Sequence, residues 1–388
     1  MSLVWLFDNL RTEPFGVIPL TNLSGKGGPS TLKHIEVVSS YNWSKRTEGN
    51  ESTEPTIIVP GAPKQFRNWQ GGKLPEDSGQ FIYDVDHMIM PRCPMEPLFH
   101  SAFVEASRTA KSFDLKQFDL VTDCINLQKL FTFCKGEDAC GFFRIDLERI
   151  GETVLATRVE GQDVINIDFP SFDQSLKQTC CAPLQPELEG AHSRVVSYQL
   201  GELRLLVRME VDCAAFTEQE LEPLMDGPLL QPDCQQSESL PFSTVRHVQS
   251  RPISVSSPMS SSTSPDGRGF PTFVWPLLFF SALDSMVVGW WTDQNTFKKP
   301  VIYKLTDVNK LVKPLPYSTL SKVYDLLQKI IKFMRRNDES VKTSLVWRGQ
   351  QFIEIYEKAP AASGAISELM KSHLRGDVPA AAEGERSV

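Results

Sequence analysis

Two acidic side chains at the end of one strand-like segment could do chemistry in this chain. Residues 203–212, LRLLVRMEVD, read as a β-strand, and alternate side chains of a strand share a face. Glu210 and Asp212 therefore lie on one surface. Carboxylates so close together raise each other's pKa unless a cation separates them, and a divalent metal ion is the obvious candidate. The alternative is a solvated strand face on which Arg204 and Arg208 balance the two acids.

Further polar residues extend this pattern along the chain. Asp173 lies near the start of residues 171–179, which are expected to form a helix, and it is either a third metal ligand or an ordinary acid of a helix N-terminus. Residues 243–251, STVRHVQSR, predict another strand, on which His247 and Gln249 share one face. Both residues belong to the site in one interpretation. In the other, His247 is a strand histidine with its hydrogen bonds satisfied and Gln249 is a surface residue.

The elements that must position these residues are mainly strands with helices interspersed. Helices are expected at residues 96–107 and 318–334, and residues 118–134 predict a strand followed by a helix that begins after Thr122 or Asp123. Two hairpins are expected with turns at Gly151-Glu152 and Gly201-Glu202, and a final pair of strands from residues 344 to 358. The fold class is therefore α+β, or mixed α/β, with a central twisted mixed β-sheet flanked by helices.

Changes in composition divide the chain. Residues 1–54 are expected to form a loosely packed lead-in, residues 55–358 a single domain, and residues 359–388 a flexible tail. Within the domain, the Ser/Pro-rich residues 252–269 are expected to form a mobile loop. Residues 270–291 are very apolar, but prolines and Asp284 interrupt them, so they predict buried strands rather than a membrane span.

Charge and cysteine usage limit the functions to consider. The formal net charge of -8 and a pI near 5.4 exclude broad electrostatic capture of nucleic acid or of an anionic membrane, so a nucleic-acid site requires a local basic cleft. Arg204, Arg208, Arg246 and Arg251 could form one, or could pair with the acids in a solvated network. The eight cysteines include no C-x-x-C pair and the N-terminus does not read as a signal peptide, so an intracellular protein of the cytoplasm or nucleus is expected.

Four short motifs, taken in order, resemble a known family. TDCINLQKLF at 122–131 is followed by FPSFDQ with Asp173, then by MEVDC with Glu210 and Asp212, then by HVQSR at 247–251. This order resembles the PD-(D/E)XK nuclease superfamily and, within it, the DXO-type decapping exoribonucleases. It is most similar to a group of fungal proteins with the same organisation that often carry a prenyl-synthase label. The resemblance implies a nuclease-like domain in which Asp173, Glu210 and Asp212 hold Mg²⁺ or Mn²⁺ and an RNA 5′ end is the substrate.

The chain departs from this pattern at the positions that would carry catalysis. His247 replaces an acid, Gln249 replaces a lysine, and Cys124 replaces an arginine of the first motif. A glutamine can hydrogen-bond a water but carries no charge and exchanges no proton near neutral pH. The sequence therefore favours a degenerate, non-catalytic or weakly active nuclease-fold protein that binds nucleic acid or a protein partner. The alternative is an active Mg²⁺- or Mn²⁺-dependent RNA 5′-end hydrolase.

A prenyl synthase is excluded on physical grounds. Such enzymes hold Mg²⁺ ions and a diphosphate with aspartate-rich D-D-x-x-D segments on helices, and this chain contains no D-D pair. Its strand content is also wrong for an all-helical fold.

Overall fold

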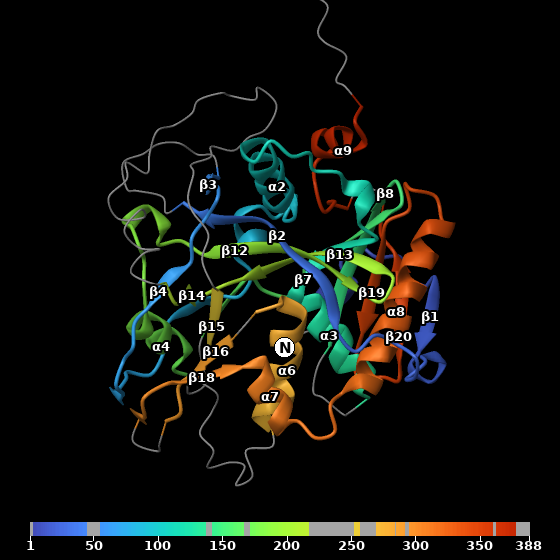
Figure 1. Cartoon of the computed structure of the whole chain (residues 1–388). Helices are drawn as coiled ribbons and strands as arrows, with labels where there is room; N and C mark the ends of the chain where they lie inside the picture. The colour runs from blue at the N-terminus through green and yellow to red at the C-terminus, as the bar shows by residue number, and fades with distance from the viewer. Residues whose placement is uncertain are drawn as a thin grey trace, which may run out of the picture.

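The computed structural model describes residues 3–44, 55–136, 142–166, 171–216, 252–256, 269–283, 285–291, 295–359 and 362–377. Within these ranges the chain is α+β, with a large mixed sheet flanked by helices, as the sequence predicts (Figure 1). No helix in the described ranges combines the length and the apolar character needed to span a bilayer.

The large sheet has ten strands among the described residues. In spatial order they are β1 (Gly16–Pro19), β20 (Phe352–Glu357), β19 (Thr343–Trp347), β8 (Phe143–Ile150), β9 (Thr153–Val159), β7 (Leu120–Asp123), β13 (Leu203–Glu210), β12 (His192–Leu200), β2 (Leu32–Trp43) and β3 (Ile57–Ile58). Strand β7 runs parallel to both of its neighbours, β9 and β13, and the other pairs are antiparallel.

Shorter strands make a second, six-stranded sheet. Its order is β11 (Cys181–Ala182), β4 (Lys64–Phe66), β14 (Cys213–Ala214), β15 (Pro252–Ser256), β16 (Ser285–Val288) and β18 (Val301–Lys304). Two small ladders join β10 (Val164–Asn166) to β6 (Gln80–Ile82) and β17 (Thr296–Phe297) to β5 (Gly72–Lys73). The chain passes from β13 in the large sheet to β14 in the second sheet through Val211 and Asp212, so these residues stand at the junction of the two sheets.

Helices cover both faces of the large sheet, and others lie beside the second sheet. They are α1 (Val85–Ile89), α2 (Glu96–Arg108), α3 (Cys124–Lys135), α4 (Asp173–Cys180), α6 (Gly269–Ser281), α7 (Leu305–Leu311), α8 (Tyr317–Arg336) and α9 (Glu368–Arg375). Figure 1 shows α2 and α9 on one side of the sheet and α3, α6 and α8 on the other. Helix α4 lies apart from these, beside the second sheet.

Strand β13 connects the two cores because its side chains alternate. Leu205 and Val207 enter the core that holds α3, α6 and α8, whereas Leu206 enters the core under α2 and α9. The sequence assigns these residues to the same two faces. Glu210 lies on the face of Leu206, at the end where the strand leaves the core.

Several predicted elements are confirmed. Helix α2 covers the predicted helix 96–107, and α8 covers 318–334 with its apolar stripe buried. Strand β7 ends at Asp123 and α3 begins at Cys124, so the predicted change from strand to helix is at the expected place. Both hairpins form, and Gly151 and Gly201 have positive φ angles of 56° and 64° at their turns.

Four expectations differ from the structure. Residues 269–281 form helix α6, not a strand, because an apolar run of this length does not distinguish a buried helix from a buried strand. The lead-in 1–54 is not loosely packed, since it contributes β1 and the twelve-residue β2 to the large sheet. The tail from residue 359 includes α9, and residues 252–256 of the predicted loop form β15.

Candidate functional site

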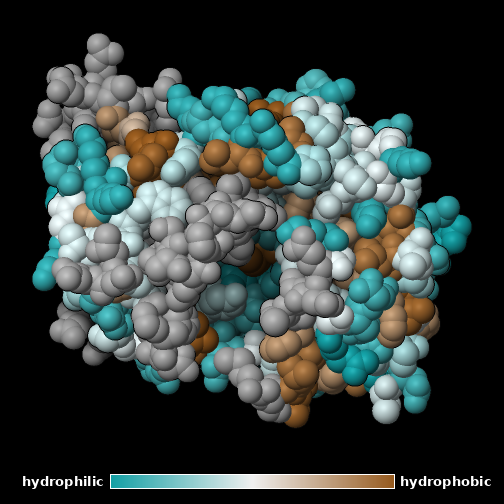
Figure 2. Space-filling view, turned by 90° about the horizontal axis from the view of Figure 1, so that it is seen from below, coloured by the Kyte–Doolittle hydropathy of each residue, from teal (hydrophilic) through white to brown (hydrophobic). Residues whose placement is uncertain are grey.

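A groove lies where the end of β13 meets helix α4. It has a volume of about 320 Å³, and its lining includes Glu210, Asp212, Lys177, Lys64 and the buried His192. The groove therefore gathers residues from both sheets and from α4. Figure 2 shows a hollow on the face of the molecule seen from below, and the coloured surface inside it is mainly hydrophilic.

Lys177 is the residue that organises the acids of this groove. Its Nζ lies 2.6 Å from Oδ1 of Asp212 in an ion pair that is largely shielded from solvent. Burial alone would lower the pKa of Lys177, but the negative charges of Asp212, Glu210 and Asp173 outweigh burial and hold that pKa well above its usual value. All three predicted acids therefore act on one ammonium group.

Helix α4 explains how Asp173 and Lys177 come together. Residues i and i+4 of a helix lie on the same side, so Asp173 in the first turn and Lys177 in the second share a face. Asp173 does not cap its helix. Asp77 does so from a separate loop, with its carboxylate accepting hydrogen bonds from the backbone amides of Gln174 and Ser175 at 3.0 and 2.8 Å.

Glu210 is exposed at the end of β13, and its carboxylate faces the charges of Lys177, Asp212 and Asp86. Removal from water raises the pKa of Glu210 above its ordinary value; the positive charge of Lys177 opposes this rise, while Asp212 and Asp86 add to it. The pair of acids that the sequence singles out thus has one compensating cation.

The described residues do not fit a divalent metal ion. A site for Mg²⁺ or Mn²⁺ needs several oxygen ligands that face one point. Among the described residues, no group of three or more His, Cys, Asp and Glu side chains is arranged to hold a metal. The Lys177 ammonium is bonded directly to Asp212, so a metal ion would have to displace it. The Lys177 ammonium already supplies one of the two positive charges that a divalent ion would bring.

The predicted arginines lie in different places. Arg204 is exposed at the far end of β13, six residues and about 20 Å from Glu210, with its guanidinium 5.8 Å from the ring centre of Phe118. The structure does not bring it to the groove. His247, Gln249, Arg246 and Arg251, together with the predicted strand 243–251, lie outside the described residues.

Arg208 is buried in an internal charge network. Its Nε donates to Oδ1 of Asp123 at 2.6 Å, and its Nη1 donates to the backbone oxygen of Pro94 at 2.7 Å and lies 3.3 Å from Asp86. Burial opposes the charge of Arg208, but Asp123 and Asp86 hold its pKa well above the usual value. The predicted solvated pairing of Arg208 with Glu210 and Asp212 is therefore wrong; its partners are acids buried beneath the groove.

Sequence reasoning missed Lys177, Asp86 and Asp123. The spacing Asp173-x-x-x-Lys177 in a predicted helix was a usable signal for Lys177, because it places both side chains on one face. No local pattern marks Asp86, which accepts hydrogen bonds from Tyr41 and Trp43 at 2.7 and 3.0 Å. Thr122 or Asp123 was expected to cap α3. Asp123 is at the N-cap position, but its side chain makes no cap hydrogen bond and bonds Arg208 instead.

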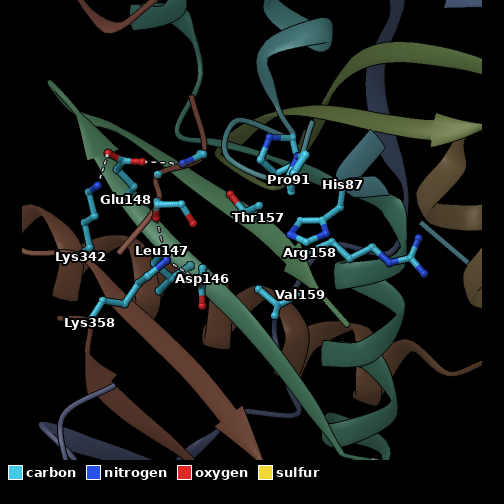
Figure 3. A pocket seen from close by; sticks show the side chains of 14 residues that line it. His87, Pro91, Asp146, Leu147, Glu148, Thr157, Arg158, Val159, Lys342 and Lys358 are labelled. Carbon is cyan, nitrogen blue, oxygen red and sulfur yellow. Dashed lines mark hydrogen bonds and ion pairs between the residues drawn. The ribbon is translucent and has the colours of Figure 1, made fainter. Parts of the chain in front are cut away.

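A second charged pocket lies at β8 and β9 (Figure 3). Asp146 bonds Arg144 and Lys358, and Glu148 bonds Lys371 of α9 and lies 3.7 Å from Lys342. Its volume is only about 40 Å³. Each of its two carboxylates thus has two basic partners.

Comparison with known protein families gives one match. The profile described as a domain of unknown function, DUF8563, matches residues 26–374. The chain belongs to this family. A search of curated proteins found no match.

Solved structures with a fold similar to that of this DUF8563 chain include those of Rai1 and Dxo1. Rai1 of Scheffersomyces stipitis, solved with (3′-NADP)⁺ and a calcium ion, has a TM-score of 0.62 at 11% identity, over 94% of this chain and 100% of that one. Rai1 of Candida albicans, solved with pU5 and Mn²⁺, has a TM-score of 0.59 at 9% identity, over 94% and 100%. Dxo1 of K. lactis, solved with manganese, has a TM-score of 0.52 at 10% identity, over 92% and 98%. At these identities the likeness shows a shared DXO-like fold.

Proposed function

We propose that this protein is a non-catalytic member of the DXO-like nuclease fold that binds the 5′-phosphorylated end of RNA in the groove between β13 and α4. The observation that carries the proposal is the 2.6 Å ion pair between Lys177 and Asp212, which places an ammonium group where a metal-dependent nuclease needs its cation. Binding of this kind requires no divalent ion.

The groove has the size and the donors that such a ligand needs. Its volume of about 320 Å³ falls within the range of small-molecule sites, about 300–1,000 Å³, and its lining includes the ammonium groups of Lys64 and Lys177. Glu210 and Asp212 would repel a phosphate if uncompensated, and the Lys177 ammonium reduces that repulsion. The Rai1 structures with pU5 and with nucleotide ligands support an RNA end as the ligand class.

A binding experiment tests this proposal directly. Fluorescence anisotropy with 5′-phosphorylated U5 RNA in EDTA is expected to show saturable binding, and 5′-hydroxyl U5 is expected to bind at least tenfold more weakly. Lys64→Glu should weaken the phosphorylated RNA about tenfold or more, because it reverses a charge in the groove. Lys116→Glu, an exposed lysine beside the far end of β13, is the matched control and should bind like wild type. Binding only with Mn²⁺, or no binding at all, would contradict the proposal.

A second candidate is a weakly active RNA hydrolase, and Lys177 is also the observation that favours it. The resemblance expects a lysine near the scissile phosphate, and Lys177 could supply from α4 the ammonium that Gln249 does not. Incubation of pU5 with Mn²⁺ separates the two. The binding proposal expects equal, background hydrolysis in wild type and in the Glu210→Ala/Asp212→Ala double variant. The hydrolase predicts product from wild type alone, with loss in Lys177→Met and partial retention in Lys177→Arg.

A further inference from the structure

Strand β18 is the last strand of the six-stranded sheet among the described residues. It pairs antiparallel with β16 on one side, where Ile302 lies opposite Val287 and Val301 opposite Val288. Backbone N–H and C=O groups of an antiparallel strand point alternately to its two sides, so half of those of β18 face away from β16. Figure 1 shows β18 at the lower end of the second sheet, beside α7. This edge therefore offers backbone groups to an added strand.

The apolar side chains of β18 are exposed. Val301 and Ile302 are 42% and 46% exposed, whereas all four residues of the neighbouring strand β16 are buried. Consecutive residues of a strand point to opposite faces, so apolar surface is present on both faces of β18. Both residues are also β-branched, the type of side chain that favours pairing in a sheet. A strand added at this edge would cover them from the side.

The chain around this edge is basic, in contrast to the chain as a whole. Residues 298–313 contain five lysines and one acid, while the whole chain has a formal net charge of -8. The acid, Asp307, bonds Lys310 at 2.9 Å. The other four lysines are exposed and make no ion pair among the described residues: Lys298, Lys299, Lys304 and Lys313. The edge therefore carries positive charge that these residues do not balance with an ion pair.

The charge and the apolar surface together decide what can occupy the edge. A second copy that pairs its own β18 here would bring the two sets of lysines together, and like charges oppose such pairing. A nucleic acid would use the lysines but would leave Val301, Ile302 and the backbone edge unused. An extended acidic peptide uses all three features, because its backbone, its apolar side chains and its carboxylates each find a partner.

We propose that the open edge of β18 binds an extended acidic segment of a partner protein, which adds to the six-stranded sheet as a further strand. Apolar side chains of the segment lie beside Val301 and Ile302. Its carboxylates lie near the lysines at the two ends of β18, Lys299 and Lys304. This surface is independent of RNA binding, because no residue of β18 lines the groove.

Fluorescence anisotropy with three labelled peptides tests this proposal. The acidic peptide DEVEVTVEE should bind with a dissociation constant below about 100 μM. The peptide DEVEPTVEE should bind at least tenfold more weakly, because proline removes a backbone donor from the added strand. The basic peptide KKVKVTVKK should also bind at least tenfold more weakly. Equal affinity for the three peptides, or no saturable binding of DEVEVTVEE up to about 1 mM, would overturn the proposal.

Variants at exposed positions locate the site without disturbing the core. Lys299→Glu should weaken DEVEVTVEE at least tenfold, because it reverses a charge beside β18. Ile302→Thr keeps a β-branched side chain but removes apolar surface, so it should weaken the peptide about threefold or more. Lys116→Glu, at an exposed lysine beside the far end of β13, is the matched control and should bind like wild type. Equal affinity of Lys299→Glu and wild type would contradict the assigned site.

The same proteins test the other two occupants. 5′-Hydroxyl U5 RNA should not displace the acidic peptide, and sedimentation should show no dimer that depends on β18. Displacement by this RNA that Lys299→Glu abolishes would assign the edge to a nucleic acid. A dimer that Ile302→Thr dissociates would assign it to a second copy. Either result would overturn the proposal.

Discussion

Two charged pockets of this molecule share Arg158 as a wall, yet they balance their charges in opposite ways. In the pocket of Figure 3, Asp146 contacts Arg144 and Lys358. Burial would raise the pKa of Asp146, but these two cations outweigh burial and lower it. In the pocket lined by α1, the start of α3 and the end of β13, burial raises the pKa of Asp86, and Arg208 only partly opposes the rise.

The difference separates carboxylates that stabilise the fold from carboxylates that are available to bind a ligand. A carboxylate with a lowered pKa stabilises the folded state in its ionised form, whereas a carboxylate with a raised pKa destabilises it at neutral pH. The pocket of Figure 3 ties α9 to β8 through Glu148 and Lys371, which is a structural role. At the groove, Lys177 is the cation that faces both Glu210 and Asp212, so we assign these two acids to binding.

The largest effect on stability should come from removing the charge of Asp146 in the pocket of Figure 3. Asp146→Asn leaves Lys358 and Arg144, which are 8% and 4% exposed, without their counter-charge. Removing one member of a buried ion pair costs about 3 kcal/mol in the free energy of unfolding, which urea denaturation measures. Asp307→Asn removes an exposed partner of Lys310 and should leave the denaturation midpoint unchanged. An equally small effect in both variants would contradict the comparison.

The same variant should change the acid stability of the protein. Because the pKa of Asp146 is lowered in the folded state, its contribution is present above the ordinary value of about 3.9 and is lost as the pH falls through the lowered pKa. The difference in free energy of unfolding between wild type and Asp146→Asn should therefore be constant from pH 7 to about pH 5 and shrink below about pH 4. If the difference in free energy of unfolding between the two proteins grows as the pH falls, the prediction is contradicted.

A smaller loss of stability is expected when the Lys177 ammonium is removed from the groove. Lys177→Met removes the 2.6 Å partner of Asp212 and the charge that opposes the raised pKa of Glu210. Since the Lys177 side chain is 33% exposed, solvent screening limits the loss to about 1–2 kcal/mol. Lys177→Arg keeps the charge and should lose less than half as much. A Lys177→Met protein as stable as wild type would show that the ammonium is not needed to balance the acids.

The smallest effect should have the opposite sign. Glu210→Gln removes a charge that the folded state disfavours. Because Glu210 is exposed, solvent screening limits the expected gain in the free energy of unfolding at pH 7 to at most about 1 kcal/mol. A raised folded-state pKa means that native protein binds more protons, so wild-type stability falls as the pH rises from the ordinary glutamate value through the raised one. The gain from Glu210→Gln should therefore fade below about pH 4. Destabilisation at pH 7 would show that Glu210 is paired.

The fold class and much of the site could be predicted from the sequence because both depend on local periodicity. Alternation in residues 203–212 assigns Leu205 and Leu206 to opposite cores, and the short motifs place Asp173 and Glu210 around one groove. Lys177 is one helical turn from Asp173, so it too was within reach of local reasoning.

The rest depends on contacts between distant segments. Asp86 and Arg208 are 122 residues apart, and only the assembled sheet brings α1 beside β13. Helix α6 was mistaken for strands because burial on all sides removes the polar positions that reveal a helical period. His247 and Gln249 lie outside the described residues, so their roles stay predictions.

Titration of Mn²⁺ into wild type, Lys177→Met and the Lys177→Met/Asp212→Asn double variant tests most directly whether Lys177 takes the place of a metal ion. If it does, the groove of wild type binds Mn²⁺ weakly, Lys177→Met binds it at least tenfold more tightly, and the double variant loses that gain. Tight Mn²⁺ binding by wild type that Asp212→Asn abolishes and Lys177→Met leaves unchanged would contradict the account.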